Sequence, residues 1–199
     1  MKVIEKEGFR FIPIFLIPGF ILLFVFWPAG VLLLLLALGV TLFFRETKVE
    51  ITFSDSDIVS PASGKVIDIR EIFEPEYLKR RVTRVSIFMS LFDEHVNYSP
   101  IKGEVEYLRH QPGGFKRAYL DEASRGNEAQ YIGLVAGDFS CLVKQIAGVI
   151  ARRIVCRLRN GQNLNTGEKL GLIRFGSRVE IFVPIGTSLQ VKNGEQVRG

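Results

Sequence analysis

The segment FGSRVEIFVP, residues 175–184, decides how the rest of this sequence is interpreted. Its second part, Arg178–Val183, combines branched and aromatic residues in the manner of a β-strand. Its first part places Gly176 directly before Ser177. A glycine leaves its own carbonyl carbon unhindered, and an adjacent serine hydroxyl can attack that carbonyl where the turn is strained and a base is near. The Gly176–Ser177 pair is compatible with an ordinary turn or with a self-cleaving peptide bond. The dipeptide alone favours the turn.

The chain after Lys48 consists of short runs rich in Val, Ile and Phe that are separated by Gly, Pro and Asn. This composition is typical of β-structure, so we expect a mostly β fold with minor helix. The helical turns are expected at Pro75–Arg81 and in the region 117–125. The expected strands are Ile58–Val59, Lys65–Ile69, Val82–Met89, Glu104–Leu108, Tyr131–Ala136, Val149–Leu158 and Arg178–Val183.

Two kinds of segment occur twice in this part of the chain. SPASGKVIDI at 60–69 and SPIKGEVEYL at 99–108 share the frame S-P-x-x-G-x-V, and NGQNLNTG at 160–167 is similar to NGEQVRG at 193–199. Repetition of this kind indicates a recurring hairpin. The N-G turns resemble those of biotinyl- and lipoyl-type domains, so we expect a barrel-sandwich-like β-domain over residues 49–199.

The N-terminal region has no charged residue between Phe11 and Phe44. An apolar run of this length indicates a lipid environment rather than a buried core helix. Pro28-Ala29-Gly30 divides the run into halves that are each shorter than the ~20 residues of a full membrane span. We therefore expect residues 1–48 to form a helical hairpin that anchors the protein in the membrane.

Basic residues stand at both ends of the apolar run, and cytoplasmic flanks of membrane segments are enriched in such residues. This pattern predicts that both ends, and the β-domain with them, lie on the cytoplasmic face of the cell membrane. A single kinked span, with its ends on opposite sides, is the alternative. The flanking residues are Lys2, Lys6, Arg10, Arg45 and Lys48.

The chain of 199 residues has a formal net charge of +5 and two residues each of cysteine and histidine. Its basic residues are scattered among the strands, which suits an anionic bilayer better than nucleic acid. Cys141 and Cys156 lie in apolar contexts and are expected to be buried free thiols. The cysteines and histidines lack the spacing of a zinc site, so we expect no metal.

Three longer blocks resemble the phosphatidylserine decarboxylases of the short bacterial and archaeal type. They follow the order of that family and bring the resemblance to nearly all of residues 57–199. The resemblance implies a pyruvoyl-dependent lyase that converts phosphatidylserine, or an archaeal serine phospholipid, into the ethanolamine phospholipid. The blocks are FMSLFDEHVNYSPIKGEV at 88–105, PGGFKRAYLDEASRGNE at 112–128 and the run at 145–184.

The resemblance also implies a proenzyme that cleaves itself between Gly176 and Ser177. Two chains then remain associated, and the second begins with a pyruvoyl group derived from Ser177, which forms a Schiff base with the substrate amine. The histidine of the family falls on His95, in DEHVN, as the group that moves the proton. His110 lies outside that motif.

Arg174 and Arg178 flank the bond and are candidates for binding the phosphate of the substrate, because a guanidinium can hold two phosphate oxygens. Alternation along a strand would place both on one face, and such faces are usually solvated. The sequence leaves the oligomeric state open, a homo-oligomer included.

One position departs from the family in a way that concerns the chemistry. Ser63 in SPASG replaces an aspartate that is thought to orient the histidine, and Tyr98 stands where longer members have a second histidine. A serine supplies no charge, and Asp93, Glu94 and Asp138 are the acidic residues that could replace it. A second hypothesis therefore stays open, that of an unprocessed, non-catalytic, membrane-tethered β-domain that binds lipid head groups or a protein partner.

Overall fold

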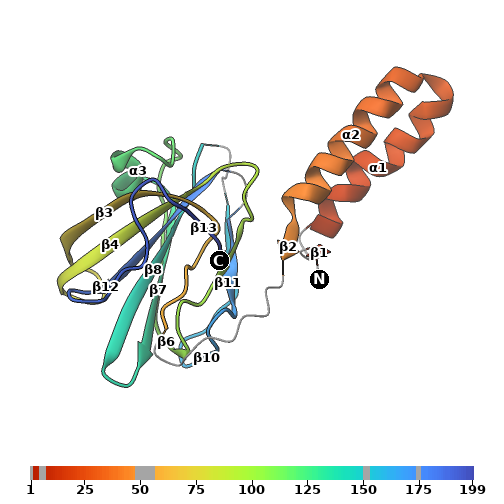
Figure 1. Ribbon diagram of the computed structural model, residues 1–199. Helices are drawn as coiled ribbons and strands as arrows, with labels where there is room; N and C mark the ends of the chain where they lie inside the picture. The colour runs from red at the N-terminus through yellow and green to blue at the C-terminus, as the bar shows by residue number, and fades with distance from the viewer. Residues whose placement is uncertain (1, 5–7, 48–56, 150–152, 174–175) are drawn as a thin grey trace. The chain divides into compact units, whose positions relative to one another are not determined.

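The computed structural model describes residues 2–4, 8–47, 57–149, 153–173 and 176–199 (Figure 1). The chain forms two compact units, Met1–Ile51 and Thr52–Gly199. The division follows the change in composition after Lys48. Each unit is described by itself below.

The N-terminal unit is a pair of apolar helices, α1 (Gly8–Val25) and α2 (Trp27–Phe43). The rings of Phe11 and Phe44 stack with centroids 5.7 Å apart, so the start of α1 lies beside the end of α2. Beyond the helices, β1 (Lys2–Ile4) and β2 (Arg45–Thr47) pair antiparallel. The expected helical hairpin is confirmed.

The bend of the hairpin lies two residues before Pro28, where the sequence indicated that the break begins. It occurs at Phe26, and Pro28 stands inside the first turn of α2 rather than between the helices. Proline is tolerated there because the first amides of a helix have no intrahelical acceptor. Gly30 allows the two helices to approach closely, since a Cβ atom at this position would lie 2.5 Å from the Leu23 nitrogen.

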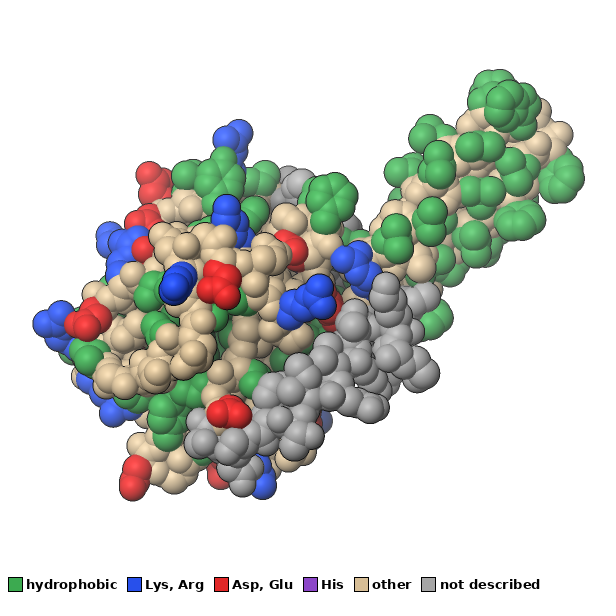
Figure 2. Space-filling model, viewed as in Figure 1, with side chains coloured by type: hydrophobic (Ala, Val, Ile, Leu, Met, Phe, Trp, Pro, Cys, Tyr) green, Lys and Arg blue, Asp and Glu red, His purple; other side chains and the backbone are tan. Residues whose placement is uncertain are grey.

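The surface of the hairpin is apolar. Figure 2 shows hydrophobic side chains over most of its visible face, and at the bend Phe24 and Trp27 are 88% and 68% exposed. Helix α1, with 18 residues, is long and apolar enough to cross a membrane, while α2 is shorter. Large exposed apolar surfaces of this kind mark contacts with lipid or protein.

The described residues of the second unit form a curled antiparallel sheet of eight strands, a smaller sheet of three strands and one short helix (Figure 1). The order in the large sheet is β10-β6-β7-β8-β12-β4-β3-β13, and in the small sheet β5-β11-β9. The predicted mostly β class is thereby confirmed. The bounds are β3 Gly64–Glu74, β4 Arg80–Met89, β5 Val96–Tyr98, β6 Gly103–Gln111, α3 Asp121–Gly126, β7 Ala129–Ala136, β8 Phe139–Ile146, β9 Ile154–Cys156, β10 Asn163–Leu164, β11 Lys169–Ile173, β12 Ser177–Pro184 and β13 Gln196–Val197.

The sequence repeats correspond to a structural repeat. The two S-P-x-x-G segments lead into the antiparallel strand pairs β3–β4 and β6–β7, and the two N-G segments supply the edge strands beside them. Gly64 pairs with Val197, and Gly103 pairs with Leu164 in the equivalent place. A Cβ atom on either glycine would lie 2.3 or 2.4 Å from a carbonyl oxygen of the next strand, so the same close approach explains both glycines.

Several of the element predictions were wrong or incomplete. Strand β8 was missed because polar residues inside it hide the alternation, and Ile58–Val59 is an irregular segment. In the stretch 149–158 the described strand is Ile154–Cys156, and residues 150–152 lie outside the described part. In the stretch Pro75–Arg81, residues 75–78 form a turn without a helix and Arg80 begins β4. The Glu74 carboxylate accepts hydrogen bonds from three successive backbone amides in this turn.

The main core lies on the face of the large sheet from which Val85, Val143, Val179 and Ile181 project. Leu170 and Ile173 of the small sheet pack into it. A smaller cluster on the opposite face includes Val82, Leu142 and Phe182. Cys141 is buried and Cys156 half-buried, and both are free thiols. Burial raises the pKa of Cys141 to about 12, so this thiol stays protonated at neutral pH.

Candidate active site

Ser177 begins β12, a central strand of the large sheet that lies between β4 and β8. It pairs with Met89, and its side chain projects to the same face as Val179, into the main core. The side chain is fully buried, and within the described residues its hydroxyl has no hydrogen-bond partner. An unsatisfied buried hydroxyl costs free energy, so the fold maintains Ser177 in this place against a penalty.

The peptide before Ser177 is held in an unusual backbone conformation. Gly176 has φ +41°, in the left-handed region that side chains disfavour. Its carbonyl oxygen faces Gly148, where an added Cβ atom would lie 2.0 Å from that oxygen. Both positions therefore require glycine, and the carbonyl that a hydroxyl would attack lies against the backbone at Gly148. Arg174 and Phe175, just upstream, lie outside the described residues.

His95 is almost completely buried and immediately precedes β5. Its backbone carbonyl accepts a hydrogen bond from Ile173, the last residue of β11. The ring atom Nδ1 lies 2.8 Å from the backbone oxygen of Asp93. Because a carbonyl can only accept, Nδ1 carries the hydrogen and the lone pair of the neutral ring is on Nε2. The ring is therefore oriented to take a proton at Nε2.

A chain of contacts connects the histidine segment to Ser177. Asn97, two residues after His95, donates from Nδ2 to the sulfur of Met89 at 3.5 Å. Met89 is the strand partner of Ser177, and paired residues have side chains on the same face. The sheet β5-β11-β9 thus places the segment that carries His95 over the end of the large sheet that carries Ser177.

Ser63 lies at this end as well, but its hydroxyl accepts a hydrogen bond from the backbone nitrogen of Gly199 at 3.1 Å. The segment is attached to β5 because the Pro61 carbonyl accepts from the Tyr98 amide at 2.9 Å. The Nδ1 partner of the histidine is the main-chain carbonyl of Asp93. Of the three acidic residues considered from the sequence, Asp93 thus contributes its backbone rather than its carboxylate.

Arg178 is completely buried, so the expectation of a solvated face was wrong for this residue. It projects from β12 to the face opposite Ser177, where its guanidinium lies 2.8 Å from both the Glu180 carboxylate and the Ser86 hydroxyl. Burial of this face lowers the pKa of Arg178, and the Glu180 charge counteracts the shift. The structure therefore does not bring Arg178 to the side chain of Ser177.

The remaining histidine lies elsewhere. His110 is in β6, its side chain is 51% exposed, and its Nε2 atom is 3.9 Å from the Glu128 carboxylate. Within the described ranges, no three side chains of His, Cys, Asp or Glu come together as metal ligands.

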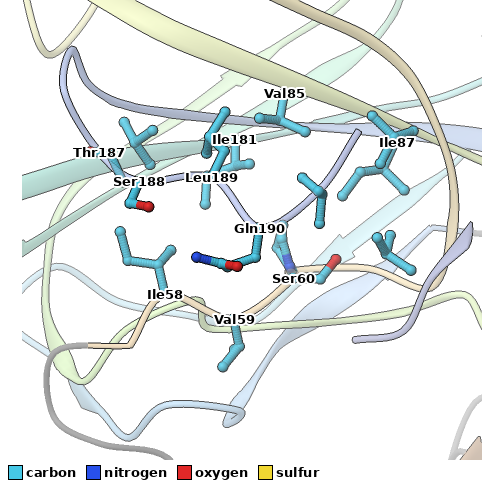
Figure 3. A pocket seen from close by; sticks show the side chains of 15 residues that line it. Ile58, Val59, Ser60, Val85, Ile87, Ile181, Thr187, Ser188, Leu189 and Gln190 are labelled. Carbon is cyan, nitrogen blue, oxygen red and sulfur yellow. The ribbon is translucent and has the colours of Figure 1, made fainter. Parts of the chain in front are cut away.

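Two of the cavities that lie away from Ser177 adjoin the large sheet. The first, of about 120 Å³, is bounded by the irregular segment 58–61, by β3, β4 and β12, and by the loop 187–191 (Figure 3). The second, of about 470 Å³, is on the opposite face of the sheet, and charged residues line it, among them Arg70, Arg84, Asp121, Lys144 and Glu180.

Sequence reasoning missed the polar residues that hold the surroundings of Gly176. Asn127 is completely buried and donates from Nδ2 to the carbonyls of Lys116 and Ala147, each at 2.7 Å. It thereby ties the loop before α3 to the residue that precedes Gly148. Asn127 lies within a block that carries the family resemblance, but the letters alone do not say that its amide is buried.

The comparisons with known proteins point in one direction. A family model described as Phosphatidylserine decarboxylase matches residues 36–199. A phosphatidylserine decarboxylase proenzyme of Symbiobacterium thermophilum is 41% identical over 196 residues, which cover 98% of this chain and 91% of that protein. Proenzymes of the same name from Carboxydothermus hydrogenoformans (43% over 175 residues; 87% and 82% covered) and Ehrlichia canis (38% over 197 residues; 98% and 87% covered) are also similar.

Proposed function

This chain belongs to the phosphatidylserine decarboxylase family, and we propose that it decarboxylates phosphatidylserine with a pyruvoyl group made from its own Ser177. The observation that carries the proposal is the Gly176–Ser177 bond. A buried hydroxyl, without a partner in the described part of the chain, directly follows a glycine in a left-handed conformation. The relatives are named proenzymes, which implies processing.

In the proposed maturation, the Ser177 hydroxyl attacks the carbonyl carbon of Gly176. His95 takes the hydroxyl proton at Nε2 and delivers it to the departing amide nitrogen, so an ester replaces the peptide. Loss of the Cα proton of Ser177 then breaks the Cβ–O bond and releases Gly176 as a carboxylate. Water adds to the remaining dehydroalanine and ammonia leaves, which produces the ketone on residue 177.

The surroundings of position 177 fit such a group, because a ketone has nearly the size of the serine side chain and removes a hydroxyl that lacks a partner among the described residues. The pyruvoyl group supplies a carbonyl that combines with the substrate amine and accepts the electron pair left by CO2. His95 is the proposed donor of the proton that returns to the substrate. Its ring is held through Nδ1, and burial excludes water from it.

The cleavage itself is tested by the intact mass of the purified, denatured protein. We expect two chains, 1–176 and 177–199, with a ketone and no α-amine on the second. Vesicles that contain phosphatidylserine should gain phosphatidylethanolamine when the protein is added. A single chain would instead support the unprocessed lipid-binding domain, and a 177–199 fragment with a free serine amine would exclude pyruvoyl formation.

We further propose that residues 1–48 anchor the β-domain of residues 49–199 at the cytoplasmic face of the membrane. The long apolar helix α1 and the exposed apolar surface of the hairpin support this proposal. Arg10 at its start and Arg45 after α2 agree with cytoplasmic ends.

Deletion of residues 1–48 is therefore expected to give a soluble β-domain, because the second unit has its own core. Sedimentation with anionic vesicles measures the effect, with the full chain as the control. The full chain should sediment with the vesicles, and most of the truncated domain should remain in the supernatant. Equal sedimentation of the two would show that the anchor lies elsewhere.

A further inference from the structure

A second unsatisfied polar atom lies close to Ser177 and has no part in the function described so far. Gln145, in β8, is completely buried and pairs with Val179 of β12. Its side chain is therefore on the same face as Val179 and Ser177. Gln145 and Ser177 are diagonal neighbours on adjacent strands, with a typical separation of roughly 7 Å.

The orientation of the Gln145 amide follows from its neighbours. The thioether of Met89 can only accept a hydrogen bond, so the Nδ2 group of Asn97 faces Met89 and Oδ1 faces Gln145. Gln145 then donates from Nε2 to this Oδ1 at 2.7 Å. Gly171 packs against the amide, since a Cβ atom there would lie 3.3 Å from Nε2. The side chain is fixed from both sheets.

This arrangement leaves the Oε1 atom of Gln145 without a hydrogen-bond partner in the described part of the chain. The Ser177 hydroxyl is in the same condition, so a donor and an acceptor on neighbouring strands both remain unsatisfied. The two do not bond to each other. A buried carbonyl oxygen that is held in one orientation and lacks a donor is typical of a site that receives its donor from a ligand.

We infer that Gln145 Oε1 accepts a hydrogen bond from the amino group of the substrate while that group reacts at position 177. The inference rests on the proposed function. An ammonium group has three N–H donors, whereas the carboxylate and phosphate of a serine phospholipid offer only acceptors that a carbonyl oxygen repels. Gln145 thus directs the amine of the head group toward residue 177. Asn97 positions the amide.

The variant Gln145→Met removes the acceptor and keeps the length of the side chain. We expect it to process itself and to contain as much ketone as the wild type. The assay uses phosphatidylcholine vesicles that contain increasing amounts of phosphatidylserine, and cyanoborohydride reduces the Schiff base between the ketone and the substrate amine. The readout is the phosphatidylserine concentration at which half of the 177–199 fragment is trapped in this way. This half-saturation concentration should rise roughly 10- to 100-fold, because that is the usual effect of losing a hydrogen bond to a charged group. The change in kcat should be smaller.

Two further variants make the result specific. Gln145→Glu retains acceptor oxygens and should restore most of the lost affinity. Gln130→Met is the matched control, because Gln130 is also buried and pairs with Gln145, but lies one strand further from β12 and donates to the Tyr131 carbonyl. Its half-saturation should equal that of the wild type.

An unchanged half-saturation in Gln145→Met, with normal ketone content, would overturn the inference while the proposed function stands. A wild-type chain without ketone would overturn the proposed function and the inference with it. If the melting temperature shows that Gln145→Met does not fold, Asn97→Leu is the variant that tests the inference. It releases the Gln145 amide and should also raise the half-saturation, and an unchanged value would again overturn the inference.

Discussion

Replacement of Ser177 by alanine is expected to leave one uncleaved chain that has no ketone and no decarboxylase activity. No other atom at this position can attack the Gly176 carbonyl, so the loss should be complete rather than partial. The fold should survive, because the variant removes a buried hydroxyl that has no partner among the described residues. A denaturing gel, the intact mass and the release of CO2 from phosphatidylserine measure the three consequences.

Ser188→Ala is the matched control, since Ser188 is an exposed serine in the loop after β12. It should process and decarboxylate like the wild type. A melting temperature of Ser177→Ala close to that of the wild type would separate lost chemistry from lost structure. Cleavage after Gly176 in Ser177→Ala, or a ketone on its C-terminal fragment, would show that another group breaks the chain.

The features that the sequence predicted well are those that depend on local pattern. The apolar run from Phe11 to Phe44 contains its own bend, and a hairpin follows from length and from the Pro28 region without any knowledge of partners. The repeated S-P-x-x-G and N-G segments indicated a structural repeat, and each S-P-x-x-G segment contains a glycine that its neighbouring strand requires. Gly64 and Gly103 have the same close carbonyl contact in the two halves of the sheet.

The features that the sequence did not predict depend on which faces of the sheet become buried. Arg178 carries a charge and was expected in solvent, yet β12 is central in the sheet and the face from which Arg178 projects is buried around the Glu180 carboxylate. Strand β8 was missed for a related reason. Its polar residues Lys144 and Gln145 are buried on opposite faces, where each has a specific hydrogen-bond partner. The alternation of polar and apolar residues along the sequence does not indicate which polar residues have such partners.

Replacement of His95 by alanine is expected to slow self-cleavage by roughly 10²- to 10⁴-fold, the usual contribution of a general acid–base group. The lone pair on Nε2 is the proposed acceptor for the Ser177 proton, and alanine offers none. The half-time of conversion to two chains measures the effect. His110→Ala is the control, because this half-exposed histidine lies in β6 beside Glu128 and should not change the half-time. An unchanged half-time in His95→Ala would remove His95 from the processing step.

The same measurement on Ser63→Asp decides what orients the ring. A carboxylate near His95 would stabilise the imidazolium that forms when Nε2 takes the proton, so we expect faster cleavage, within a ceiling of roughly 10⁴-fold known from a hydrolase triad. The gain should fall well short of that ceiling, since the Asp93 carbonyl already holds Nδ1 at 2.8 Å and orientation is in place. A half-time equal to that of the wild type would show that this backbone carbonyl is enough to orient the His95 ring. It would also show that Ser63, whose hydroxyl accepts a hydrogen bond from the Gly199 amide, holds the C-terminus in place and does not act on the histidine.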